Sequence, residues 1–195
     1  MTLHSWPFEL DPIHVYAYAE KVFSKQECEK IITLAQKEKE IESKVFYKNT
    51  TTYDKKIRQS QIRWLAPTSD FKWVFQKVTD ITNLLNDKYF KFDIFGAIEG
   101  IQFTSYKAPG GKYGKHVDRS LGALVRKLSI SIQLSDPKDY KGGEICFYDS
   151  AEKQPAPRDQ GIFIAFPSFV QHEVLPVTKG ERHSLVCWIT GKPFK

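Results

Sequence analysis

The second half of the chain is a series of short runs, rich in apolar and β-branched residues, that are separated by Gly, Pro and Asp turns. Short runs with turn residues between them are typical of strands in a β-sandwich or barrel. The runs cover residues 92–105, 127–134, 144–149, 161–166, 171–177 and 182–190. We therefore predict a mostly antiparallel barrel after Leu85, with residues 107–126 as a long connection of the kind that often carries function.

Two helical patterns precede the predicted barrel. Ser24 and Glu27 have the spacing of a capping box, and the apolar residues after them recur at helical intervals, which predicts a helix over about 25–39. A second apolar stripe with helical spacing predicts a helix over 70–87. The segments predicted as strands in this half are 13–22 and 58–65. Helices followed by a barrel make the predicted fold class α+β.

The chain of 195 residues is predicted to form one domain over 1–195, because no linker or low-complexity tract divides it. Its hydrophobic content of 41% suits a sizeable packed core. We expect strands and helices of a supporting layer in residues 1–90 and the barrel itself in residues 91–195.

Composition and the N-terminal sequence narrow the cellular setting. The three cysteines are widely spaced and form no C-x-x-C pair, which favours a reducing compartment. The N-terminus has no basic segment followed by an apolar run, and no stretch approaches the roughly 20 apolar residues of a membrane helix. These features predict a cytoplasmic protein without a membrane partner. The net charge of +6 favours acidic partners only weakly.

A histidine and an aspartate two positions apart, His116 and Asp118, close the stretch Tyr106–Asp118. In an extended segment residues i and i+2 share a face, so both side chains can bind one ion. His172 is a candidate third ligand, since it opens a strand-like segment near the end of the predicted barrel. Two imidazoles and a carboxylate leave positions open on an ion, as in non-haem Fe(II) oxygenases. The pair alone is a common chance pattern, for which a solvated turn is the alternative.

Arg182 begins the last predicted strand. Period-2 alternation places Arg182 on the same face as Ser184 and Trp188, and His183 on the other face, where we interpret it as structural. A buried arginine needs a partner that offsets the loss of its hydration. The carboxylate of a small ligand can fill this role by accepting two hydrogen bonds from the planar guanidinium. A surface acid is the alternative partner.

These residues lie in segments similar to those of the 2-oxoglutarate- and Fe(II)-dependent dioxygenases, specifically the prolyl 4-hydroxylase-like branch of bacterial and viral type. The resemblance covers about 92–192. The segments that carry it are Y-K-A-P-G-G-K-Y-G-K-H-V-D, R-K-L-S-I-S-I-Q-L-S-D-P-K-D-Y-K-G-G-E-I-C-F-Y and F-P-S-F-V-Q-H-E-V-L-P-V-T-K-G-E-R-H-S-L-V-C-W-I-T-G. The fold that it implies is a double-stranded β-helix, or jelly roll, with N-terminal supporting helices.

The resemblance implies a role for each of the residues that match. The implied Fe(II) ligands are His116, Asp118 and His172. The implied contacts of 2-oxoglutarate are Arg182, which would bind the distal carboxylate, with Tyr106 and Ser184 beside it. Collagen-type members usually have lysine at the position of Arg182, which places this chain nearer the bacterial and viral members. Weaker candidates for contact with the substrate are Tyr113, Arg119, Arg63 and Trp64.

The activity that the resemblance implies is hydroxylation of an amino-acid side chain, most plausibly proline in a peptide or protein. Fe(II) would be the cofactor, 2-oxoglutarate and O2 the cosubstrates, and succinate and CO2 the coproducts, with L-ascorbate as a candidate reductant. Residues 108–112 would form a flexible loop at the mouth of the site. Three alternatives stay open: the same chemistry on nucleic acid, the same chemistry on a free small molecule, and a non-catalytic jelly-roll module that binds a metal or ligand.

Overall fold

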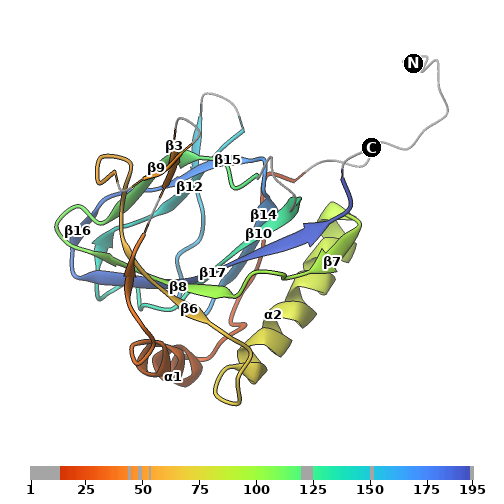
Figure 1. The fold of residues 1–195 in the computed structure, drawn as a ribbon, viewed down its shortest axis with the longest axis horizontal. Helices are drawn as coiled ribbons and strands as arrows, with labels where there is room; N and C mark the ends of the chain where they lie inside the picture. Colours follow the sequence, from red (N-terminus) through yellow and green to blue (C-terminus); the bar gives the residue numbers. More distant parts are fainter. Residues whose placement is uncertain are drawn as a thin grey trace.

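The computed structural model describes residues 14–43, 45–47, 50–52, 54–119, 125–149 and 152–193. Two antiparallel sheets face each other, and two helices cover the outer face of the larger sheet (Figure 1). The helices are α1 (Lys25–Ala35) and α2 (Lys72–Leu85), and α2 continues into a π-helical turn, η1 (Asn86–Phe90). None of the helices in these ranges is long and apolar enough to cross a bilayer.

The larger sheet has the strand order β1-β14-β10-β17-β8-β6-β2, and β7 also pairs with β17. Its strands are β1 (Ala17–Ala19), β2 (Ile41–Glu42), β6 (Gln61–Leu65), β7 (Ile94–Gly96), β8 (Ile101–Lys107), β10 (Arg126–Gln133), β14 (Phe163–Pro167) and β17 (Glu181–Gly191). Strands from both halves of the chain therefore share one sheet.

The smaller sheet has the order β13-β12-β15-β9-β5. Its strands are β5 (Arg58–Gln59), β9 (Lys112–His116), β12 (Ile145–Tyr148), β13 (Lys153–Pro155) and β15 (Gln171–Val174). Two further strand pairs lie outside both sheets. They are β3 (Val45–Tyr47) with β4 (Thr50–Thr52), and β11 (Lys141–Gly142) with β16 (Val177–Lys179).

The predicted capping box begins α1. The Ser24 hydroxyl accepts from the Glu27 N–H at 3.2 Å, and the Ser24 N–H donates to Oε2 of Glu27 at 2.7 Å. The helix ends at Ala35, four residues before the predicted end. The other carboxylate oxygen of Glu27 lies 2.7 Å from Nζ of Lys77 on α2, so the same acid also joins the two helices.

The main core lies between the helices and the larger sheet. Its members from β17 are Leu185, Cys187 and Ile189, all at most 3% exposed. Period-2 alternation turns the other side chains of β17, among them Arg182 and Ser184, toward the smaller sheet. This face is the one on which both residues were predicted to lie.

Several predicted segments differ from the structure, among them the strand predicted over 171–177, which is divided between β15 and β16. The strand predicted over 58–65 is broken at Ser60 into β5 and β6, which belong to different sheets. Ser43 holds this corner, because its N–H and its hydroxyl both donate to the Ser60 carbonyl, at 3.3 and 2.8 Å. The strand predicted over 92–105 is likewise two strands, β7 and β8.

A further difference concerns the connection predicted over 107–126, which contains β9 and is therefore not one long loop. Its first part is tied down by backbone hydrogen bonds. The Ala108 N–H donates to Gly180 at 3.0 Å, and the Gly110 N–H donates to Val177 at 2.9 Å. Of the strand predicted over 13–22, the structure describes residues from His14 onward and has only β1 as strand.

Candidate active site

Two neighbouring strands of the smaller sheet bring the predicted metal ligands together. β9 ends at His116, β15 carries His172, and the two residues are cross-strand partners. Asp118 follows two residues after His116, and its N–H donates to the Ser168 carbonyl at 3.0 Å. The candidate ligand atoms of the three side chains all lie within 4.8 Å of one another. The carboxylate lies between the two rings, 3.5 Å from Nε2 of His116 and 3.6 Å from Nε2 of His172.

Backbone carbonyls orient both imidazole rings. Nδ1 of His116 lies 2.7 Å from the Gly114 carbonyl, and Nδ1 of His172 lies 3.0 Å from the Val170 carbonyl. Because a carbonyl can only accept, each Nδ1 carries the hydrogen, and in the neutral form of each ring the Nε2 lone pair is free. Such outer hydrogen bonds are the usual way in which a protein fixes a metal-binding histidine.

The electrostatics of the three residues suit a cation. Burial lowers the pKa of His172 to about 4, so this ring is neutral at pH 7 and can act as a ligand. Burial by itself would raise the pKa of Asp118, but in acid, where the neighbouring imidazoles are protonated, the charge of His172 and the hydrogen bond and charge of His116 outweigh it and hold that pKa well below its ordinary value, so the carboxylate is already ionised when the rings become neutral. Two imidazoles and one ionised carboxylate match the donor set of non-haem Fe(II) sites.

Arg182 lies between the sheets without an acidic partner. Its side chain is only 2% exposed, and its Nε and Nη2 donate to Oε1 of Gln133 at 2.9 and 2.6 Å. Nη1 lies 3.5 Å from the Ser184 hydroxyl. Among the residues that the structure describes, no carboxylate forms an ion pair with this guanidinium. A buried cation held only by neutral groups has the capacity to bind an anion.

Two further groups complete the surroundings of Arg182. Tyr106 is its cross-strand partner on β8, and the guanidinium lies 5.3 Å from the centre of the Tyr106 ring. Gly143 has φ +73°, and a Cβ at this position would come within 3.1 Å of Cδ of Arg182. The glycine thus allows the chain to pass against the arginine stem.

The four weaker candidates lie at different places. The Tyr113 ring stacks on His116 with 3.5 Å between centroids, and the Arg58 guanidinium lies 4.4 Å over the same Tyr113 ring. Trp64 is 40% exposed, with its ring 6.2 Å from that of Trp188. Arg63 forms an ion pair with Glu40, and Arg119 is exposed directly after the metal pair.

Gln133 and a group formed by Glu99, Arg126 and Trp188 were not predicted from the sequence. Arg126 donates from Nε and Nη2 to the Glu99 carboxylate at 2.8 and 2.6 Å, and from Nη1 to the carbonyl of Asp118 at 3.3 Å. Its guanidinium lies 4.1 Å over the Trp188 ring, and the indole Nε1 of Trp188 is buried without a hydrogen-bond partner.

A signal for Gln133 exists in the sequence. Ser129, Ser131 and Gln133 alternate with isoleucine and leucine along β10, and all three are buried. Alternating polar residues in a strand that is buried on both faces indicate a polar space between the sheets. The pattern could therefore have singled out this face of β10, although it names no partner for the glutamine.

The chain is similar to a known protein family and to several curated proteins. Residues 101–190 match the family described as the 2OG-Fe(II) oxygenase superfamily. A PKHD-type hydroxylase of Prochlorococcus marinus is 36% identical over 99 residues, which are 50% of this chain and 44% of that protein. A PKHD-type hydroxylase of Synechococcus elongatus is 31% identical over 139 residues, which are 68% of this chain and 60% of that protein. The chain thus matches about half the length of these curated relatives.

Solved structures share the fold at low sequence identity. A Pseudomonas putida prolyl-4-hydroxylase superposes with a TM-score of 0.72 at 20% identity, covering 92% of this chain and 94% of its own. A Trichoplax adhaerens prolyl hydroxylase, solved with a peptide fragment of the hypoxia inducible factor oxygen degradation domain, gives 0.75 at 16% identity, covering 91% and 84%. A viral collagen prolyl hydroxylase from Paramecium Bursaria Chlorella virus-1 gives 0.69 at 19% identity, covering 92% and 97%. The predicted jelly roll with supporting helices is confirmed.

Proposed function

We propose that the chain, whose residues 101–190 match the 2OG-Fe(II) oxygenase superfamily, is an Fe(II)- and 2-oxoglutarate-dependent hydroxylase of a peptide or protein side chain, most plausibly of proline. The observation that carries the proposal is the buried Arg182, which has no acidic partner among the described residues and lies between the same two sheets as His116, Asp118 and His172. A metal bound by the triad and a buried cation without an acidic partner could together bind the two ends of one small dicarboxylate.

His116, Asp118 and His172 would hold the Fe(II). When bound, iron together with dioxygen and 2-oxoglutarate supplies the oxidising power that converts a substrate C–H bond to C–OH, with succinate and CO2 as coproducts. The protein contributes rigid ligands, because the carbonyls of Gly114 and Val170 keep both Nε2 atoms turned toward Asp118.

Arg182 would bind the distal carboxylate of 2-oxoglutarate. Gln133 occupies Nε and Nη2 through one oxygen, which leaves donors of the guanidinium for a charged oxygen of the cosubstrate. Ser184 and Tyr106 lie beside the arginine and would offer hydroxyl groups to the same carboxylate. Because Arg182 is buried, water would be excluded from around the distal carboxylate, which strengthens its ion pair with the guanidinium.

The substrate would bind on the side of Trp188 and Arg126. The unpaired Nε1 of Trp188 is a hydrogen-bond donor without an acceptor, and a peptide carbonyl would satisfy it. The exposed ring of Trp64 lies 6.2 Å from that of Trp188 and extends this aromatic surface outward. The proposal of a peptide substrate is further supported by the names of the solved relatives, which are prolyl hydroxylases, one of them with a bound peptide.

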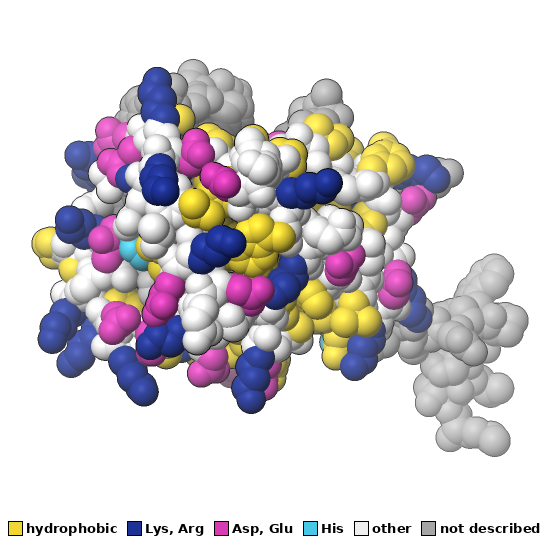
Figure 2. Space-filling view, turned by 90° about the horizontal axis from the view of Figure 1, so that it is seen from below, with side chains coloured by type: hydrophobic (Ala, Val, Ile, Leu, Met, Phe, Trp, Pro, Cys, Tyr) yellow, Lys and Arg dark blue, Asp and Glu magenta, His cyan; other side chains and the backbone are white. Residues whose placement is uncertain are grey.

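Nucleic acid is the less favoured substrate. On the face of the molecule shown in Figure 2, lysine and arginine side chains are interspersed with aspartate and glutamate. Nucleic-acid sites instead gather basic side chains in a patch or stripe. A free small molecule would use the same metal and Arg182 but would leave the exposed Trp64 without a role. L-Ascorbate is proposed only as a reductant that maintains the ferrous state.

The proposal is tested by following succinate release with Fe(II), 2-oxoglutarate and O2, and by mass spectrometry of proline-containing peptides for the gain of one oxygen atom. Wild type should give both products, and Asp118→Ala should give neither. Asp93→Ala is a matched control, because Asp93 forms an exposed ion pair with Lys192 and neither residue belongs to the triad. Failure of the wild type to bind 2-oxoglutarate in the presence of metal would contradict the proposal. Binding without turnover of any substrate would favour the non-catalytic module.

A further inference from the structure

A continuous series of ring contacts connects His172 with the surface of the protein. Phe147 is the cross-strand partner of His172, with 6.1 Å between ring centroids. Tyr16 stacks on Phe147 at 4.8 Å with the ring planes 20° apart, and Tyr18 follows with its centroid 6.3 Å from that of Tyr16. Phe166 reinforces the first step, since it lies 4.6 Å from His172 and 4.8 Å from Phe147.

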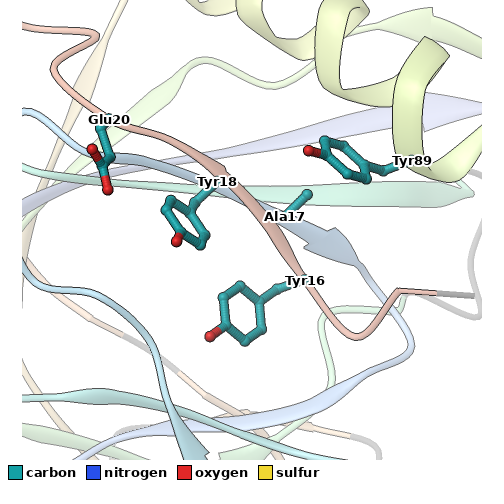
Figure 3. Close-up of a pocket in the computed structure, with 5 residues that line it drawn as sticks. All are labelled: Tyr16, Ala17, Tyr18, Glu20 and Tyr89. Atoms are coloured by element: carbon teal, nitrogen blue, oxygen red, sulfur yellow. The ribbon is translucent and has the colours of Figure 1, made fainter.

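The series ends in a hollow on the surface. Tyr16, Tyr18, Glu20 and Tyr89 line this hollow beside β1, and its volume is about 440 Å³. Figure 3 shows the rings of Tyr16 and Tyr18 on one side of β1 and Tyr89 on the other. Tyr18 is 44% exposed, so a diffusible molecule can reach it, whereas Phe147 is completely buried.

We propose that Tyr16 and Tyr18 form a protective electron relay, which returns electrons to the metal site when 2-oxoglutarate is consumed but no substrate is hydroxylated. The inference rests on the proposed function, because only that chemistry generates an oxidant at His172. A phenol is a much better one-electron donor than the benzene ring of phenylalanine. Phe147 would therefore stay chemically unchanged and would serve as the contact through which electrons tunnel from Tyr16.

The electrons and protons of this step balance. Consumption of one 2-oxoglutarate and one O2 without hydroxylation leaves two oxidising equivalents at the metal site and one oxygen atom outside succinate and CO2. Tyr16 and Tyr18 supply one electron each, and each phenol releases its hydroxyl proton to water in the hollow. Two electrons and two protons convert the oxygen atom to water. Two electrons from an enediol reductant such as ascorbate, which becomes dehydroascorbate, then restore both phenols.

Loss of the proton is part of each transfer. Burial, together with the neighbouring Tyr18, raises the pKa of Tyr16 above its ordinary value, so the phenol is protonated at neutral pH. Removal of an electron from a protonated phenol makes it strongly acidic, and the hollow gives this proton direct access to solvent. The carboxylate of Glu20 lines the same hollow and is a further acceptor.

Tyr113 contacts His116, and Trp188 is connected to Asp118 through Arg126, but each of these oxidisable rings has a cation against it. The Arg58 guanidinium lies over Tyr113, which stacks on His116. The Arg126 guanidinium lies 4.1 Å over Trp188. A cation against a ring stabilises the ring's electrons electrostatically and makes removal of one less favourable. Within the described part of the chain, no guanidinium or ammonium group lies against Tyr16, so the outward route meets no such barrier.

The relay is tested by freeze-quench electron paramagnetic resonance of protein loaded with Fe(II) and 2-oxoglutarate and mixed with O2, without substrate or ascorbate. Wild type should show a neutral tyrosyl radical, whose signal narrows when deuterated tyrosine is incorporated. The double variant Tyr16→Phe with Tyr18→Phe keeps both rings and should lose this signal. Tyr89→Phe is the matched control, because Tyr89 lines the same hollow but lies outside the series of rings that leads to His172, and its signal should persist.

Mass spectrometry of the same samples gives a second readout. In the double variant, oxygen addition should appear on Tyr113 or Trp188, and the enzyme should inactivate after fewer turnovers than wild type. An unchanged radical signal and an unchanged number of turnovers before inactivation would overturn the relay. Succinate, measured in parallel, separates the two claims. Succinate without any effect of the double variant overturns the relay alone, and absence of succinate overturns the proposed function and the relay with it.

Discussion

Arg182 donates two hydrogen bonds, from Nε and Nη2, to the single oxygen Oε1 of Gln133, at 2.9 and 2.6 Å. Both side chains are buried, yet the pair as a whole keeps its positive charge. A neutral glutamine therefore positions the guanidinium without neutralising it, and the positive charge stays available to a ligand.

Gln133→Glu should weaken binding of 2-oxoglutarate. The new carboxylate would pair with Arg182 and cancel the charge that the cosubstrate needs, so we expect the dissociation constant for 2-oxoglutarate to rise at least about tenfold, equivalent to ~1.4 kcal/mol. Binding can be measured by calorimetry in the presence of Co(II). Gln102→Glu is the control, because Gln102 is equally buried but accepts from Arg58 instead. Equal affinities of wild type and Gln133→Glu would contradict a role for Arg182 as the anchor.

A divalent metal should stabilise the folded protein through the triad. Since an ion that binds only the folded state adds about 2.7 kcal/mol at a concentration one hundred times its Kd, Co(II) should raise the melting temperature of the wild type. In Asp118→Asn the carboxylate between the two rings is lost, and this rise should disappear. Thermal unfolding with and without Co(II) measures both. A rise of the same size in the variant would place the metal elsewhere.

Trp188→Phe should raise KM for a peptide substrate and leave KM for 2-oxoglutarate unchanged. The change retains an aromatic ring beside Arg126 but removes the buried Nε1 donor, and a buried peptide carbonyl left without its donor costs about 1–3 kcal/mol. Steady-state kinetics with each compound varied in turn separates the two constants. Equal increases in both would mean that Trp188 supports the site as a whole and does not contact the substrate.

Acidification should destabilise the metal-free protein partly through His183. Burial lowers the pKa of His183, Arg63 and Arg182 act in the same direction, and Glu181 opposes them. The unfolded state then binds more protons near pH 6.5, so the unfolding free energy falls as the pH drops through this range.

His183→Gln should reduce this slope by at most about 1.4 kcal/mol per pH unit. Urea unfolding at several pH values compares the two proteins. His172, whose pKa is also lowered, contributes equally to both and cancels in the comparison. Identical slopes would show that His183 does not titrate with folding.

The sequence predicted local features well because they depend on near neighbours. The capping box of α1 needs only Ser24 and Glu27, and the inward face of β17 follows from the alternation that begins at Arg182. The metal triad was predicted from its residue types, and the structure brings its three members within 4.8 Å of one another.

Features that depend on distant partners were not predicted. The corner at Ser60 depends on Ser43, and β9 is a strand because β15 and β5 lie on either side of it. Arg126 could not be assigned a position, since its contacts with Glu99 and Trp188 join three separate segments of the chain. In each case the deciding interaction is non-local, which leaves no trace in the periodicity of the segment itself.

The two histidines of the metal triad and Arg182 belong to different sheets. His116 and His172 lie on β9 and β15 of the smaller sheet, whereas Arg182 lies on β17 of the larger one. A dicarboxylate that binds both the metal and Arg182 would connect the two sheets of the sandwich. Local unfolding of either sheet would then require release of the cosubstrate, so the stabilities of the two sheets would be coupled. Amide exchange should therefore slow together in β15 and β17 when the cosubstrate binds.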